Sequence, residues 1–158
     1  MSITEAEQLR ALPSEQARLD YIIENIEESY FADHKEYLAE TDTAWDAIHR
    51  ALTDGELTWD GGEYPLNHVV LAGELLYTDP DYILSLKSPE QVREIAAALS
   101  GVSESEFRRR YFAIDSDRYG CTVDELDFAY TWGWFQNLCR LYSKAATEGR
   151  FVLFTADQ

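Results

Sequence analysis

Apolar side chains recur every three or four residues over most of the chain, which is the spacing of amphipathic helices. Near the start, this pattern predicts a helix over 5–12 that ends at Pro13, and then a second helix capped by Ser14. A third helix is predicted over 36–52, with Gly55 just beyond its end. The first third of the chain is therefore expected to be helical.

The pattern changes in the middle of the chain. Residues 55–65 contain three glycines and a proline and are expected to form a loop. Short apolar runs over 75–77 and 82–84, separated by a turn at 79–81, are typical of two strands. Ser88-Pro89-Glu90-Gln91 has the cap, the first-turn proline and the third-position glutamine that begin a helix.

The last third contains the longest periodic segment, over 123–147. A further capping box at 103–106 precedes it, and Phe151-Val152-Leu153-Phe154 follows it as a closing strand. The expected apolar stripe of the long helix comprises Leu126, Ala129, Tyr130, Trp134, Asn137, Leu138, Leu141 and Ala145. No repeat or linker interrupts the sequence, so we predict one α+β domain over 1–158, with several helices around a small sheet and the long helix at its centre.

The net charge of the chain excludes some classes of binding partner. The 158 residues include 30 acidic and 13 basic side chains, a net charge of −17, which argues against nucleic acid and anionic membranes as partners. No run approaches the roughly 20 apolar residues of a membrane span, and the start lacks the features of a signal peptide. With only two cysteines, we expect a cytoplasmic protein. Residues 1–60 carry a net charge of −11, which serves either solubility or the attraction of a basic partner.

Few residues suggest catalysis. His49 follows Asp46 by three residues, so on a helix Asp46 could orient its imidazole for acid–base chemistry. The alternative is that His49 lies at the edge of the core and bonds to a carbonyl oxygen. No phosphate-binding loop, nucleophile motif or metal-ligand spacing is present, so no cofactor and no metal are expected. Arg108-Arg109-Arg110 is either a solvated helix face or a site for an anion or an acidic partner.

Aromatic side chains gather in the long helix, where Tyr130 and Trp134 share one face and Trp132 and Phe135 another. Gly133 between them would let a ligand or another backbone approach closely. Either both faces are buried, or one is presented to a partner.

One segment resembles a known family. Trp45-Asp46-Ala47-Ile48-His49-Arg50-Ala51-Leu52-Thr53-Asp54-Gly55 is similar to a core motif of the YfbM-like bacterial domains of unknown function. Pro65–Glu74, the helix start at 88–92 and the closing helix and strand also fit, so the resemblance covers about 36–155. It implies a cytoplasmic α+β domain and no particular reaction. Family members open with an apolar strand, for which this chain offers only Met1-Ser2-Ile3.

The first functional hypothesis is a protein-binding role, namely an acidic immunity or inhibitor protein that neutralises a bacterial toxin. An acidic surface could occlude a basic toxin domain after electrostatically steered association. The expected contact residues are Asp42, Asp46, Asp54, Glu56 and Asp60.

The second hypothesis is a small-molecule site or an enzyme, in which Trp45 stacks on a planar group and His49 acts as acid, base or donor. Tyr82 or Tyr130 would complete the pocket. Trp134 is a further candidate binding residue, on the aromatic helix face that could be presented to a partner. A deep pocket beside Trp45 and His49 would favour this hypothesis, and a flat acidic face the first. A scaffold or a homo-oligomer is the third.

Overall fold

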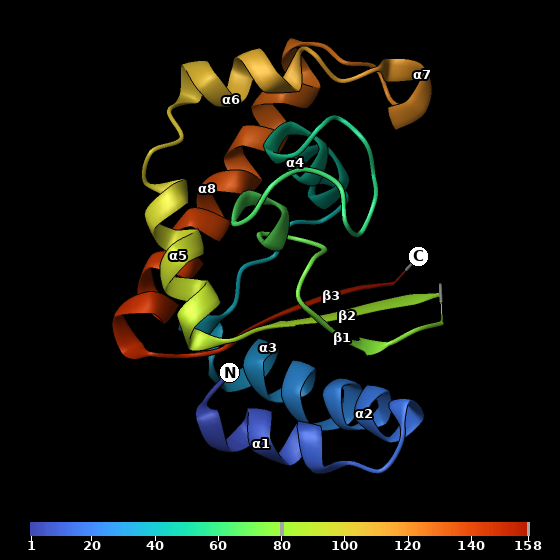
Figure 1. Ribbon diagram of the computed structural model, residues 1–158, viewed down its shortest axis with the longest axis vertical. Coiled ribbons are helices and arrows are strands. Elements are labelled where there is room, and N and C mark those ends of the chain that lie inside the picture. The colour runs from blue at the N-terminus through green and yellow to red at the C-terminus, as the bar shows by residue number, and fades with distance from the viewer. Residues whose placement is uncertain (80, 158) are drawn as a thin grey trace.

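Three antiparallel strands form the middle layer of the structure, and helices pack on both of its faces (Figure 1). The computed structural model describes residues 1–79 and 81–157. The sheet has the order β1-β2-β3, with β1 over Glu74–Tyr77, β2 over Tyr82–Lys87 and β3 over Val152–Asp157. All three strands were predicted, and the α+β architecture is confirmed. Pairing between β2 and β3 runs without a bulge from Tyr82 opposite Asp157 to Lys87 opposite Val152.

The N-terminal helices cover one face of the sheet. Ser2 caps the first of them in a capping box with Glu5, and Ser14 caps the second. These helices pack on Leu84 and Leu86 of β2 through a core of their own. The elements of this layer are α1 (Ile3–Ala11), α2 (Glu15–Tyr21), the π-helix η1 (Ile22–Glu27) and α3 (Glu28–Asp33). The chain therefore opens with a helix, and its first residues form no strand.

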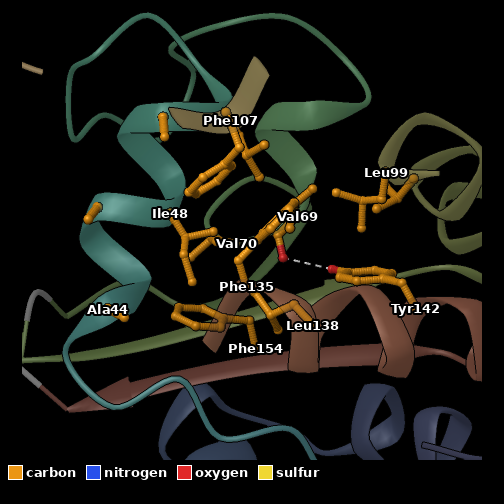
Figure 2. Close-up of a cluster of buried hydrophobic side chains, with 14 of the residues drawn as sticks. Ala44, Ile48, Val69, Val70, Leu99, Phe107, Phe135, Leu138, Tyr142 and Phe154 are labelled. Carbon is orange, nitrogen blue, oxygen red and sulfur yellow. Dashed lines mark hydrogen bonds between the residues drawn. The ribbon is translucent and has the colours of Figure 1, made fainter. Parts of the chain in front are cut away.

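The remaining helices cover the other face. Side chains from α4, α8, β3 and residues 69–70 converge on one core, where the Tyr142 hydroxyl donates a 2.8 Å hydrogen bond to the Val69 carbonyl oxygen (Figure 2). The elements here are α4 (Ala44–Leu52), the short 3₁₀ helix η3 (Leu66–His68), α5 (Pro89–Leu99), α6 (Glu104–Tyr111), α7 (Ser116–Tyr119) and α8 (Glu125–Glu148). As predicted, α8 is long, central and followed by the closing strand.

The predicted helix over 36–52 is wrong in its first half. A single 3₁₀ turn, η2 (Lys35–Tyr37), ends at Leu38, whose backbone is extended, and Asp42 has a φ of 47°. A residue in this left-handed region cannot continue a right-handed helix. Only Ala44–Leu52 is helical, and residues 38–43 form a strap that crosses from one helical layer to the other (Figure 1).

The predicted stripe of the long helix is also partly wrong. Leu126 is 81% exposed, whereas the buried residues of α8 are Phe128, Thr131, Phe135, Leu138, Tyr142 and Ala145. Aromatic packing against α6 decides this orientation, because the ring of Phe107 stacks on Phe135 at 4.4 Å and approaches Trp132 at 5.4 Å. The arginine run of α6 is engaged within the fold, since Arg108 pairs with Glu125 and the other two pair with Glu106.

Candidate functional site

A cavity of about 420 Å³ lies along the outer edge of β3. Its walls come from β3, from η1 and α3 below the sheet, from α8 above it, and from the strap with its flanking residues Tyr37 and Trp45. We call this cavity the β3-edge cleft. Its volume lies in the range that holds small ligands, which is about 300–1,000 Å³.

Apolar side chains line the inner part of the cleft. Trp45 enters from the first turn of α4, and its ring lies 5.9 Å from that of Phe154 on β3. Leu138 and Leu141 of α8 and Phe31 of α3 add further apolar surface. A wall of this kind favours a ligand with an apolar or planar body.

A hydrogen-bonded chain of polar side chains lies at one end of the cleft. The Arg150 guanidinium stacks on Tyr37, with 3.8 Å between Cζ and the ring centre, and its Nη2 donates a 3.1 Å hydrogen bond to Tyr30 Oη. Tyr30 Oη donates in turn to Glu5 Oε2 at 3.0 Å. Within the described residues, the buried Nε of Arg150 has no hydrogen-bond partner.

These contacts fix the protonation states at that end. Burial, followed by the hydrogen bond to Glu5, raises the pKa of Tyr30 to about 12, so the phenol stays protonated. Burial alone would raise the pKa of Glu5, but hydrogen bonds from Ser2 and Tyr30 lower it overall. At neutral pH these three hydrogen-bonded side chains are therefore the Glu5 carboxylate, the neutral Tyr30 phenol and the Arg150 guanidinium.

Carboxylates outnumber bases around the cleft. Glu27, Glu40, Asp42 and Asp157 are among its lining residues, and Arg150 is the one basic side chain among those described. Glu27 is held in place, because its Oε1 accepts 2.7 Å hydrogen bonds from Tyr82 Oη and Thr155 Oγ1. The cleft therefore combines an apolar interior with an excess of negative charge.

Tyr82, Tyr130 and Trp134 lie next to the cleft without filling it. Tyr82 reaches it only through Glu27. Tyr130 Oη shares a 3.4 Å hydrogen bond with Thr43 Oγ1 at the end of the strap, and its ring meets that of Trp134 edge-on at 6.2 Å. Trp134 lines an adjoining groove on the other side of the strap residues Leu38, Ala39 and Glu40, and it does not line the cleft.

His49 lies outside the cleft. It is fully buried in α4, and its Nε2 bonds to the Thr58 carbonyl oxygen at 3.0 Å, as the structural alternative predicted. Burial lowers the pKa of His49, so the ring is neutral at physiological pH. Asp46 does not orient this ring, because its carboxylate pairs with Arg50. The predicted acid–base pair is therefore not assembled.

The expected acidic contact residues belong to two places. Asp42 lines the cleft, whereas Asp46, Asp54, Glu56 and Asp60 lie on α4 and the loop that follows it. Three of these four have partners within the chain: Asp46 pairs with Arg50, Glu56 with Arg118, and the Asp54 carboxylate accepts hydrogen bonds from the backbone amides of residues 56 and 62. Other exposed acids, including Glu24 and Glu28, lie on the opposite side of the sheet. The acidity is thus spread over both helical layers.

A family model described as a domain of unknown function (DUF1877) matches residues 1–155. The chain belongs to the DUF1877 family. The DUF1877 match includes the N-terminal helices that form the lower wall of the cleft, which the resemblance over 36–155 left out. No curated protein and no solved structure matches the chain. Among the described residues, no helix has both the length and the apolar character needed to cross a bilayer.

The polar lining residues that the sequence did not single out include Glu27, Tyr30, Tyr37, Glu40, Arg150 and Asp157. They come from η1, α3, η2, the strap, the connection after α8 and β3, and they meet only because β3 returns beside the N-terminal layer. Arg150 alone gave a local signal, since it is a charged residue set between the Gly149 helix end and an apolar strand.

Proposed function

We propose that the protein acts by binding a ligand in the β3-edge cleft, and that this ligand combines an apolar, planar body with a cationic group. The observation that carries the proposal is the composition of the cleft, in which Trp45 and Phe154 form an aromatic wall and the described lining contains four carboxylates and one arginine. The rings supply apolar contact area, and the carboxylates attract a cation. Glu27, Tyr30 and Arg150 are held in place by hydrogen bonds, as the orienting polar groups of preformed ligand sites commonly are.

The same geometry favours binding over catalysis. His49 is buried against the Thr58 carbonyl, away from the cleft, and His68 and both cysteines are absent from its described lining. Tyr30 keeps its proton because of its raised pKa. Among the described lining residues, the Thr155 hydroxyl does donate to a carboxylate, that of Glu27. The same Glu27 oxygen also accepts from Tyr82, and the described lining contains no histidine or cysteine to act with this pair.

A charge series with one ring tests this proposal. Tyramine, tyrosol and 4-hydroxyphenylacetate carry the same phenol with a positive, a neutral and a negative side chain. We expect affinity to fall in that order in ligand-observed NMR titrations at low salt. The step between the cation and the anion should be about five- to tenfold, because a solvent-exposed ion pair contributes up to about 1 kcal/mol. The opposite order would assign the cleft to anions through Arg150, and equal affinities would remove the role given to the carboxylates.

The exposed acids support a second candidate function, an immunity or inhibitor protein that binds a basic toxin domain. Asp60 and the outer acids of α2, η1 and α3 are exposed, and the net charge of −17 would steer such a partner. For this second candidate we also propose a cytoplasmic location and membership of the YfbM-like group. Replacing Asp54 and Asp60 by lysine, which reverses their charge, should weaken the capture of a co-encoded basic toxin. It should also make the capture less sensitive to salt. Unchanged capture would count against an electrostatic interface.

A further inference from the structure

The outer edge of β3 has unpaired backbone groups. In the order β1-β2-β3, the last strand has a neighbour on one side only. Within the described residues, no hydrogen bond joins the backbone of Val152–Asp157 to any segment other than β2. The strap lies across the cleft from β3 and does not pair with it. The cleft therefore occupies the position of a fourth strand.

A short bridge at one end shows which backbone groups point into the cleft. Phe151 exchanges two hydrogen bonds with Met1, one from Phe151 N to Met1 O at 3.1 Å and one from Met1 N to Phe151 O at 2.8 Å. Met1 lines the cleft, so the backbone of Phe151 faces it. Because backbone direction alternates along an antiparallel strand and the β2–β3 register is regular, the N–H and C=O groups of Leu153, Thr155 and Asp157 face the cleft as well.

At the opposite edge of the sheet, side chains cover the backbone of β1. Arg18 Nη1 of α2 donates to the Leu76 carbonyl oxygen at 3.4 Å, and Glu15 accepts a 2.9 Å hydrogen bond from the amide of Thr78 just after β1. Side chains of α2 thus engage the backbone along β1, as proteins commonly do to prevent strand addition. In the part of the chain that the structure describes, no side chain bonds to the backbone along the outer edge of β3, which opens onto the β3-edge cleft instead.

We propose that an extended segment of a partner protein, with alternating apolar and basic side chains, adds to β3 as a fourth strand in the β3-edge cleft. The proposal rests on the proposed binding function of this cleft. Backbone hydrogen bonds to Leu153, Thr155 and Asp157 supply the register, as in other cases of strand addition. Apolar side chains of the segment contact Trp45 and Leu138, and its basic side chains meet the carboxylates of Glu40 and Asp42.

The dimensions and charge agree with this occupant. The six residues of β3 span about 20 Å at roughly 3.4 Å per residue, which is enough for a strand of five or six residues. A second copy of this chain would bring together two molecules that each carry a charge of −17, which opposes close association. A basic segment from a different protein neutralises the lining carboxylates instead.

The test uses an acetylated and amidated hexapeptide in which valine and lysine alternate, together with two variants N-methylated at alternate backbone nitrogens. One methylated set removes the amides that face β3, and the other set removes those that face the strap. We expect one set to lose about tenfold or more in affinity in isothermal titration and the other to bind nearly as well as the parent peptide. The same peptide with glutamate in place of lysine should not bind.

Amide hydrogen exchange locates the contact. In the free protein the amides of Leu153 and Thr155 should exchange much faster than those of Val152 and Phe154, and the bound peptide should slow the first pair selectively. Glu40→Gln combined with Asp42→Asn should weaken peptide binding about tenfold. Glu24→Gln should leave it unchanged, because Glu24 is exposed and does not line the cleft.

Three results with a peptide that binds, or with the free protein, would overturn the proposal. They are equal binding of both methylated peptides, protection by the peptide outside β3, and slow exchange of Leu153 and Thr155 in the free protein that depends on protein concentration. The last would assign the edge to a second copy of the chain. If tyramine occupies the cleft while the parent peptide does not bind, the strand addition fails and the proposed binding function stands.

Discussion

Raising the pH from 7 to 9 should stabilise the protein through Lys87, and replacing Lys87 by methionine should remove this gain. Lys87 is fully buried on β2, where its Nζ donates a 2.5 Å hydrogen bond to the Val70 carbonyl oxygen and further bonds to Ser85. Within the described residues, no carboxylate pairs with it. Burial therefore lowers the pKa of Lys87 well below its ordinary value.

The sign of the pH effect follows from the number of protons bound by the native and the unfolded states. Between the lowered native pKa and the ordinary lysine pKa of about 10.4, the unfolded chain binds a proton that the native state lacks, so stability rises with pH. The gain approaches about 1.4 kcal/mol per pH unit where the native amine is fully neutral. The raised pKa of the half-buried Cys139 thiol, about 11, acts in the opposite direction, because the unfolded thiol ionises first.

Urea unfolding at pH 7, 8 and 9 measures this effect as the difference between the wild type and Lys87→Met, in which the contribution of Cys139 cancels. Lys35→Met is the matched control, because Lys35 is exposed and should leave the slope unchanged. Burial lowers the pKa values of the His49 and His68 imidazoles, so both histidines stay neutral across this range. Parallel curves for the wild type and Lys87→Met would show that the native amine is charged.

Truncating Trp45 to alanine should have the largest effect on binding in the cleft. Its ring packs on Phe154 and forms the wall against which a planar ligand would lie. We expect tyramine to lose about 1–2 kcal/mol, or roughly five- to thirtyfold in affinity, because aromatic residues central to a site contribute most of its binding energy.

Trp134→Ala is the matched control for this change. Both tryptophans are partly buried, but Trp134 lines the adjoining groove rather than the cleft, so its removal should change affinity less than twofold. Circular dichroism establishes that each variant is folded. An equal loss for both variants would mean that tyramine binds elsewhere or that the loss reflects stability alone.

Local signals in the sequence predicted most of the fold. The capping residues Ser2, Ser14 and Ser88 each begin a helix, and Gly149 ends the longest one, because caps depend only on neighbouring residues. The strap was missed because the backbone of Asp42 is left-handed, which the apolar pattern of 36–52 does not reveal. The face of α8 was misjudged because contacts with Phe107 of another helix decide it.

The candidate site was less predictable for the same reason. Trp45 stood out in the sequence and does line the cleft, but its neighbour His49 points into the core. Tyr30, Tyr37 and Arg150 join Trp45 only through the tertiary fold, which places the N-terminal helices against the last strand. The residue types alone suggest a site with aromatic side chains. Which residues form that site depends on the arrangement of the sheet and cannot be seen in the sequence.

The most direct measurement is a map of backbone amide shifts in ¹⁵N-labelled protein during a tyramine titration. Binding in the β3-edge cleft predicts shifts in β3, in the strap over 38–43 and at Trp45, with little change in the loop over 53–62. Shifts concentrated around that loop and His49, or no shifts at millimolar tyramine, would contradict a binding site at the edge of β3.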